Sequence, residues 1–290
     1  MKLSKIFQLA LAAAIVVAAA VVVFDGGVAG KEKTITILHT NDTHSQIFPI
    51  AADKGRWAGF GGYAKRAYLI DGIRAEGHGV LLFDSGDFSQ GTPYFNFFKG
   101  NIEVDAMGLM DYDAVTLGNH EFYNGVEELA RRVDRAEFPV LSANYDFSGS
   151  AMEGKTLPFK MFDVKGVKVG AFGLTINTRG MVDAANARGA VYKDPVACAQ
   201  WAADTLRALG ADVVVALTHL GERSTPFYIG DDSLAAKTSG IDLILGGHSH
   251  TDGISTVRNK EGGEVTIVQQ ASQGRLLGRV DITVKKKKKE

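Results

Sequence analysis

The chain has 290 residues, a length that fits one large domain or two small ones. Hydrophobic residues make up 46% of it and charged residues 22%, a composition that allows a buried core and excludes a wholly disordered protein. The formal net charge of −1, from 32 basic and 33 acidic side chains, argues against a protein that wraps nucleic acid. The single cysteine, Cys198, excludes an intrachain disulfide and a cysteine-rich zinc cluster.

The first thirty residues have the pattern of an export segment. Lys2 and Lys5 precede an apolar run over residues 9–24, and the small residues 28–30 follow it. This order predicts a secretory signal peptide, with a retained membrane anchor as the alternative. Both interpretations leave residues 1–30 outside the fold and place the rest of the chain on a periplasmic or extracellular face.

Five short apolar runs are each followed directly by polar side chains. The runs cover residues 35–38, 80–83, 114–117, 213–217 and 241–245, and the polar clusters cover 40–44, 84–87, 118–121, 218–219 and 246–250. Runs of Val, Ile and Leu that are this short and continuous predict strands buried on both faces. In α/β folds, ligand sites gather just beyond the carboxyl ends of the strands, which is where all five clusters fall.

Helical periodicity separates these predicted strands. Residues 126–133 carry apolar side chains at i, i+3, i+4 and i+7, with Asn124 as the predicted N-cap. Residues 198–209 also share one apolar face, so we interpret Cys198 as a small core residue. The alternation of strands and helices predicts one α/β domain over residues 31–284, and we interpret the basic tail 285–290 as a solvated chain end.

Five of the seven histidines lie in the polar clusters, with two aspartates and an asparagine beside them. These side chains are Asp42, His44, Asp87, Asn119, His120, His219, His248 and His250. Oxygen and imidazole ligands without thiolates suit Zn, Mn or Fe. A set of this size is too large for one open catalytic ion and suffices for two divalent metal ions that share a carboxylate. Such a pair, about 3.5–4 Å apart, lowers the pKa of bound water, so that a hydroxide is present near neutral pH.

The clusters resemble the motifs of the calcineurin-like metallophosphoesterases. Asp-x-His at 42–44, Gly-Asp at 86–87, Gly-Asn-His-Glu at 118–121, His219 and Gly-His-x-His at 247–250 occur in that order, each after a predicted strand. The longer matches Thr-Asn-Asp-Thr-His and Gly-Asn-His-Glu-Phe are similar to the 5′-nucleotidase branch, which includes UDP-sugar hydrolases and 2′,3′-cyclic nucleotide phosphodiesterases. The resemblance spans residues 33–284 and implies an α/β fold with two facing mixed β-sheets flanked by helices.

The resemblance also implies a role for each matching residue. One ion would be held by Asp42, His44, Asp87 and His250, and the other by Asp87, Asn119, His219 and His248, with Asp87 as the bridge. His120 matches the family's histidine that binds no metal, and with Asn119 it would contact the substrate phosphate. Its implied role is to stabilise the transition state or to protonate the leaving oxygen. The Gly-Asp match favours Asp87 over Asp84 as the bridge and leaves Asp84 a supporting position.

Two departures from the family pattern bear on activity. Many nucleotidases pair the catalytic histidine with an aspartate, and Tyr123 stands at that position here. A phenol, with a pKa of about 10, cannot stabilise an imidazolium as a carboxylate does, and Glu121 is the candidate substitute. Two-domain members also continue beyond the position of Val284 into a nucleoside-binding domain. Two hypotheses for nucleoside binding are a separate chain and the Phe-rich stretch 95–98.

Three functions stay open. The favoured one is a phosphohydrolase that releases phosphate from nucleotides, and the first alternative is a 2′,3′-cyclic nucleotide phosphodiesterase or UDP-sugar hydrolase. The second alternative is a metal-bound subunit of low activity that needs the separate nucleotide-binding chain. Tyr123 favours this last function, whereas the complete ligand set and His120 favour the first two. A dinucleotide-binding domain is discounted because no Gly-x-Gly-x-x-Gly follows the first strand.

Overall fold

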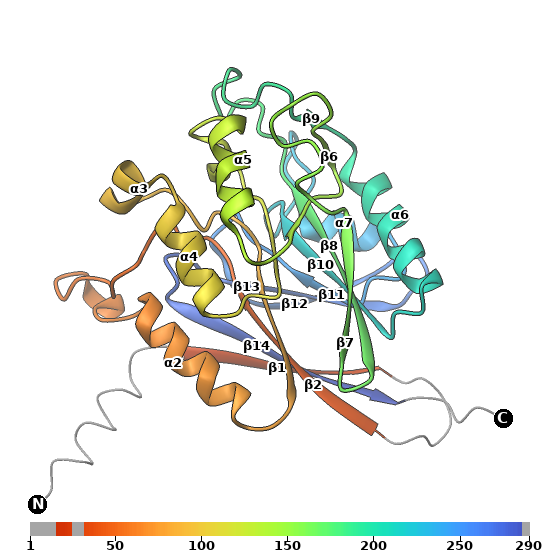
Figure 1. Cartoon of the computed structure of the whole chain (residues 1–290). Coiled ribbons are helices and arrows are strands. Elements are labelled where there is room, and N and C mark those ends of the chain that lie inside the picture. Colours follow the sequence, from red (N-terminus) through yellow and green to blue (C-terminus); the bar gives the residue numbers. More distant parts are fainter. Residues whose placement is uncertain (1–15, 25–31, 286–290) are drawn as a thin grey trace, which may run out of the picture.

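Two six-stranded β-sheets face each other between outer helices (Figure 1). The computed structural model describes residues 16–24 and 32–285. The first sheet has the strand order β1-β14-β2-β3-β4-β5, the second has the order β12-β13-β11-β10-β8-β7, and β6 and β9 form a small separate sheet. Both large sheets are mixed: β2 is parallel to β3 and antiparallel to β14, and β13 is parallel to β11 and antiparallel to β12. The predicted fold class is therefore confirmed.

The bounds of the elements are as follows. The first sheet holds β1 (Val16–Phe24), β2 (Glu32–Thr40), β3 (Gly79–Asp84), β4 (Ala114–Thr116), β5 (Val140–Leu141) and β14 (Leu276–Lys285). The second holds β7 (Phe159–Val164), β8 (Val167–Thr175), β10 (Val213–His219), β11 (Leu243–Leu245), β12 (Asp252–Arg258) and β13 (Glu264–Gln270), and the small sheet holds β6 (Tyr145–Asp146) and β9 (Val191–Tyr192). The helices are α2 (Tyr63–Arg74), α3 (Pro93–Phe98), α4 (Asn101–Leu109), α5 (Val126–Arg135), α6 (Pro195–Ala208) and α7 (Asp231–Lys237), with single turns at Gly55–Trp57 and His120–Phe122.

The core consists of three apolar layers. The middle layer lies between the sheets, where Ile37 of β2 and Val215 of β10 belong to one buried cluster. On the outer face of the first sheet, α2, α4 and α5 bury residues such as Leu129. On the outer face of the second sheet, α6 and α7 bury residues such as Leu206 (Figure 1). Because both sheets are covered on both faces, their central strands are continuous apolar runs, as the sequence predicts.

The parallel strands direct five loops toward one end of the molecule. In the first sheet β2, β3 and β4 run parallel, and in the second sheet β8, β10 and β11 do so. Each of the five predicted apolar runs contributes a strand, although β4 and β11 are only three residues long. The polar clusters therefore lie at or just beyond the carboxyl ends of β2, β3, β4, β10 and β11.

Two predicted helices are confirmed as α5 and α6, with corrected ends. The N-cap of α5 is Gly125, not Asn124, because the backbone there has a φ of 89°, which glycine adopts without strain. Leu209 follows the last residue of α6 and is 53% exposed, so it does not share the buried face. Cys198 packs at the border of the core and is only half-buried, rather than fully inside.

Part of the segment expected to lie outside the fold forms a strand. β1 pairs in parallel with β14 at the edge of the first sheet. Its run of valines favours an extended backbone, and the outer edge of β14 offers unpaired backbone groups. The use of residues 1–30 as a signal or anchor stays a prediction. Within the described ranges, no helix is long and apolar enough to span a membrane. Lys285 ends β14, and the rest of the predicted tail lies outside the described residues.

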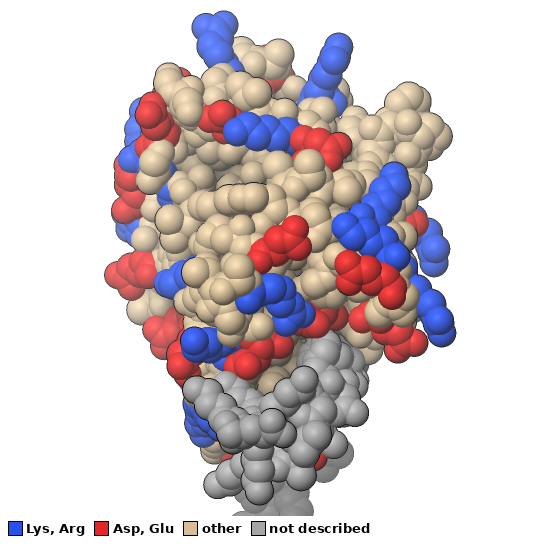
Figure 2. Space-filling view, turned by 90° about the vertical axis from the view of Figure 1, so that its right-hand side faces the viewer, with Lys and Arg blue, Asp and Glu red and all other residues tan. Residues whose placement is uncertain are grey.

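Acidic and basic side chains are mixed on the surface. Figure 2 shows Lys and Arg interspersed with Asp and Glu over the face that lies on the right of Figure 1. A surface of this kind produces no long-range field of one sign on that face, in keeping with the net charge of −1.

His39 gives rise to a testable pH dependence of stability. Its imidazole is fully buried on β2, and neither ring nitrogen has a hydrogen-bond partner among the described residues. Burial lowers the pKa of His39 from 6.5 to about 3. Between these values the unfolded chain binds a proton that the folded chain excludes, so stability falls as the pH drops through this window.

We expect this group to remove about 2 kcal/mol of unfolding free energy between about pH 7.5 and about pH 5. The variant His39→Asn does not titrate there and should lack this part of the pH dependence. Denaturant titrations of both proteins at the two pH values measure the difference. Equal pH slopes for the two proteins would show that His39 is not the group responsible.

Candidate metal centre

The polar loops of the two sheets are joined to one another by hydrogen bonds. The loop after β2 is tied to the loop after β3, because the backbone N–H of Asp42 donates to Gly86 O at 2.9 Å and that of His44 donates to Asp87 O at 3.0 Å. The loop after β11, from the other sheet, binds the same place: the backbone N–H of His248 donates to Asp42 Oδ2 at 2.9 Å. These bonds bring side chains from both sheets into one centre.

Asp42, His44 and His250 form the first group of facing ligand atoms. The Nε2 atoms of His44 and His250 lie 2.9 Å apart. Both face Asp42 Oδ1, at 3.8 Å from His44 and 3.2 Å from His250. Burial lowers the pKa of His44, and the nearby carboxylates of Asp87 and Asp42 offset only part of this effect. A neutral imidazole of this kind is the form that binds metals.

Asp87, His219 and His248 form the second group. Asp87 Oδ2 lies 3.0 Å from His219 Nε2. The other ring nitrogen of His219, Nδ1, is 2.7 Å from Ser85 O, which fixes its proton there and leaves Nε2 free to act as a ligand. Asn119 Oδ1 lies 3.1 Å from His248 Nδ1, so the amide faces the same group.

The buried charges at this centre favour a bound cation. Burial alone would lower the pKa of His219, but Asp87 and Asp42 outweigh it and raise the pKa to about 10. Burial would likewise raise the pKa of Asp87, and His219 holds it well below its usual range. For His248, burial and the neighbouring His219 lower the pKa to about 4. A divalent cation would compete with the proton on His219 Nε2 for the same two carboxylates.

His120 lies beside the two groups and shares atoms with them. Its Nε2 is 3.6 Å from Asp87 Oδ2, and it forms a third group with His44 and Asp87. Its backbone N–H donates to Asp87 Oδ1 at 2.8 Å. The Tyr123 ring packs on the imidazole, with ring centroids 4.4 Å apart. The Tyr123 ring therefore lies beside His120 at the sequence position where many nucleotidases have an aspartate.

The backbone of the centre is strained at the predicted ligands. Five of them have left-handed φ values: Asp42 (49°), His44 (47°), Asp87 (55°), His248 (76°) and His250 (54°). Such values are uncommon for residues other than glycine and cost about 1–3 kcal/mol each. Strain concentrated at one place is typical of functional sites, where the surrounding structure enforces it.

Two motif glycines allow the loops to approach one another. A Cβ at Gly118 would lie 2.1 Å from Asp87 Oδ1, and one at Gly247 would lie 2.8 Å from His219 Nδ1. Any side chain at these positions would displace a candidate ligand. The glycines of Gly-Asn-His-Glu and Gly-His-x-His thus have a steric function in the centre.

Glu121 has a role that the sequence did not indicate. Its carboxylate is fully buried and accepts four hydrogen bonds: from Gly118 N at 2.7 Å, Asp87 N at 2.8 Å, Ser89 N at 3.2 Å and Ser89 Oγ at 2.9 Å. None of these donors is His120. The hypothesis that Glu121 pairs with His120 is therefore wrong, because the carboxylate is occupied in holding the loops after β3 and β4 together.

Two further aspartates are buried near the centre. Asp84 accepts hydrogen bonds from Thr40 Oγ1 at 2.6 Å and Gly86 N at 2.9 Å, and burial raises its pKa to about 7. It belongs to none of the three groups of facing ligand atoms, in keeping with the supporting position predicted for it. Asp231, which sequence analysis missed, begins α7, and a Cβ at Gly246 would lie 2.4 Å from its Oδ2. In the sequence, its place directly after Gly230 is the only mark of this carboxylate, and its burial is visible only in the structure.

The Phe-rich stretch lies on α3. Phe95 is buried, with 7% exposure, while Phe97 and Phe98 are 80% and 47% exposed. Phe48, four residues after His44, is 62% exposed, and its ring lies 5.9 Å from that of Tyr94 on the same helix. The stretch therefore contributes to the surface rather than to the core, apart from Phe95.

Comparison with known proteins agrees with this geometry. Residues 35–252 match the family of calcineurin-like phosphoesterases. Over 277 aligned residues the chain is 36% identical to the snake venom 5′-nucleotidase of Crotalus adamanteus, covering 88% of this chain and 46% of that protein. The chain therefore belongs to the calcineurin-like phosphoesterases, and the relatives it matches include 5′-nucleotidases.

Solved structures support the same relationship. The fold is similar to that of the 5′-nucleotidase precursor from Thermus thermophilus, with a TM-score of 0.79 and 35% identity over 86% of this chain and 51% of that chain. It is also similar to the calcineurin-like phosphoesterase YfkN from Bacillus subtilis, with a TM-score of 0.73 and 29% identity over 89% of this chain and 87% of that chain. The chain spans about half the length of the curated nucleotidases it matches.

The contrast between two buried aspartates tests the ligand set. We expect Asp87→Asn to bind fewer than two ions per chain, because its carboxylate faces His219 and is the one predicted to hold both ions. Asp84→Asn is the matched control and should keep two ions, since its carboxyl group faces Thr40 and Gly86 instead. Inductively coupled plasma mass spectrometry of protein loaded with Mn²⁺ or Zn²⁺ measures both. Two fully retained ions in Asp87→Asn would remove Asp87 from the bridging position.

Proposed function

We propose that the chain is a metal-dependent phosphohydrolase that releases phosphate from nucleotides, as a 5′-nucleotidase does. The observation that carries this proposal is the convergence of carboxylate, amide and imidazole side chains from two sheets. Their facing atoms form three groups, two of which share Asp87, and Asn119 faces His248 beside them. Membership of the calcineurin-like phosphoesterases and the similarity to 5′-nucleotidases support it.

The residues present fit two divalent ions. Asp42, His44, Asp87 and His250 would hold one, and Asp87, Asn119, His219 and His248 the other. The donor set of carboxylate, amide and imidazole suits Zn, Mn or Fe. When bound, two such ions supply positive charge for the phosphate oxygens and lower the pKa of water for the attack.

The protein side chains around the ions orient the substrate and move a proton. Asn119 and His120 lie in the loop after β4, where Asn119 faces His248 and His120 lies against Asp87, so both would reach a phosphate held at the centre. His120 would donate a proton to the leaving oxygen or stabilise the charge that develops on it. The Tyr123 ring, packed at a tilt on His120, would restrict the rotation of the imidazole and exclude water from one of its faces.

The residues of the centre indicate a phosphate ester as substrate, but they do not distinguish between the groups that the phosphate is attached to. A 2′,3′-cyclic nucleotide or a UDP-sugar would place the same phosphate chemistry at the centre, and Tyr123 in place of an aspartate keeps these alternatives open. A metal-bound subunit of low activity that needs a separate nucleotide-binding chain is the remaining alternative. The export pattern of residues 1–30 supports an action on nucleotides outside the cytoplasm.

Substrate profiling tests the function. We expect the purified chain, loaded with Mn²⁺ or Zn²⁺, to release phosphate from AMP faster than it hydrolyses UDP-glucose or 2′,3′-cyclic AMP. Turnover of an aryl phosphate alone would mean that the metal centre works and that nucleoside recognition is supplied elsewhere. No turnover of any of these esters by fully metal-loaded protein would favour the subunit of low activity.

Replacement of His120 tests its proton-transfer role. We expect His120→Ala to lower kcat for AMP by about 10²–10⁴-fold while metal content stays at the wild-type level. Tyr123→Phe is the matched control: it keeps the ring packing and removes only the phenol, so kcat should stay within about twofold. Loss of metal from His120→Ala would instead identify His120 as a ligand, as its contact with Asp87 allows.

A further inference from the structure

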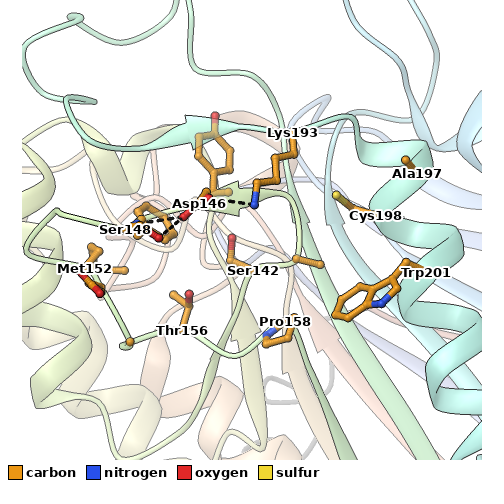
Figure 3. A pocket seen from close by; sticks show the side chains of 15 residues that line it. Ser142, Asp146, Ser148, Met152, Thr156, Pro158, Lys193, Ala197, Cys198 and Trp201 are labelled. Carbon is orange, nitrogen blue, oxygen red and sulfur yellow. Dashed lines mark hydrogen bonds and ion pairs between the residues drawn. The ribbon is translucent and has the colours of Figure 1, made fainter.

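A cavity lies between the small β6-β9 sheet and the first turns of α6 (Figure 3). Its volume is about 490 Å³, and none of the seven predicted metal ligands lines it. Ligand sites for small organic molecules have volumes of about 300–1,000 Å³. The cavity is thus large enough for one such molecule and is separate from the metal centre in its lining residues.

The walls of this cavity are mainly apolar and include an aromatic face. Met152, Pro158 and Ala197 line it together with Trp201. The Trp201 ring packs against Phe159, with centroids 5.6 Å apart, and remains 50% exposed. Figure 3 shows Trp201 on the side of α6, across the cavity from Met152 and Thr156. A half-exposed indole at the border of a cavity offers a stacking surface to a planar ring.

One polar group in the lining has no partner. Ser142 is 5% exposed, and its backbone N–H donates to Leu157 O at 2.8 Å, but its Oγ has no hydrogen-bond partner among the described residues. A buried hydroxyl without a partner costs free energy, and a ligand group that bonds to it would remove that cost. Ser142 therefore marks where the polar edge of a ligand would lie.

The charged groups around the cavity take part in one ion pair and several hydrogen bonds. Lys193 Nζ lies 3.0 Å from Asp146 Oδ2, and Asp146 Oδ1 accepts hydrogen bonds from Ser148 N at 3.0 Å and Ser148 Oγ at 2.6 Å. The Glu153 carboxylate accepts from Gly149 N at 2.8 Å. At the start of α6, Asp194 accepts from Ala197 N at 2.8 Å. Among the described residues that line the cavity, the one cation, Lys193, is thus paired, while the carboxylate of Glu153 keeps its negative charge. The lining therefore does not attract a phosphate, and the site fits a molecule without negative charge.

We propose that this cavity binds an uncharged heteroaromatic molecule of nucleoside size, with its ring on Trp201 and its polar edge on Ser142 Oγ. The choice of a nucleoside rests on the proposed function, because a nucleoside is the product of that reaction. The cavity is then a product-binding site apart from the metal centre.

Fluorescence of Trp201 reports on the cavity directly. The sequence has two tryptophans, so Trp57→Phe leaves Trp201 as the single indole. We expect adenosine to change the emission of Trp201 in a saturable way. AMP should bind no more tightly than adenosine, and inorganic phosphate should leave the emission unchanged. In the same background Ser142→Ala should weaken adenosine binding about fivefold. Ser255→Ala, on β12 at the opposite edge of the second sheet, is the matched control and should bind as before.

The single cysteine gives an independent measurement on the unmodified chain. Cys198 lines the cavity, and burial raises the pKa of its thiol, so alkylation is followed at about pH 8.5. Saturating adenosine should slow the alkylation of Cys198 severalfold in wild type and less in Ser142→Ala. Metals removed with a chelator should leave this protection unchanged, because the metal centre shares no lining residue with the cavity.

The outcomes separate this proposal from the proposed function. Loss of phosphate release with intact Trp201 and Cys198 responses would overturn the phosphohydrolase and leave the cavity as a nucleoside site. A response to adenosine that does not saturate, that disappears with the metals, or that is identical in Ser142→Ala would overturn the cavity proposal.

Discussion

Two carboxylates buried where the sheets meet impose the main constraint on this structure. Asp42 and Asp87 have exposures of 0% and 1%, and charged groups this deeply buried are costly unless they are paired or coordinate a metal. Backbone N–H groups and imidazoles from both sheets surround them. Left-handed backbone at five predicted ligands and glycines at positions 118 and 247 bring those partners within reach. Strained backbone in the loops therefore accompanies the gathering of charged side chains at one place.

Much of this arrangement could be predicted from the sequence, because the information is local. A short apolar run followed by Asp, Asn or His predicts both the strand and the place where its polar residues gather, and all eight candidate side chains lie at that end of the molecule. The N-cap of α5 could not be predicted in this way. Asn124 has the better capping side chain, but the backbone at Gly125 requires a left-handed φ.

Features that depend on contacts between distant parts of the chain could not be predicted, because a local sequence pattern does not show which segments meet in the fold. Glu121 belongs to a recognisable motif, yet its role depends on donors 32 and 34 positions away in the chain. The apolar run of residues 16–24 is compatible with a signal, an anchor or a strand, and only the pairing with β14, distant in the sequence, makes it a strand. Periodicity placed Cys198 on the inner face of α6 but could not show that this face ends at a cavity.

The division of the centre between the sheets has a mechanical consequence. Each set of proposed ligands joins side chains from the first sheet, such as Asp87, to histidines carried by β10 or by the loop after β11 of the second. Ions held by both sides would join the two sheets, in addition to the apolar middle layer. Binding to the native state alone raises its stability with ion concentration. Separation of the layers would then release the ions, so metal supply would add to the stability that the apolar layers give the sandwich without ions.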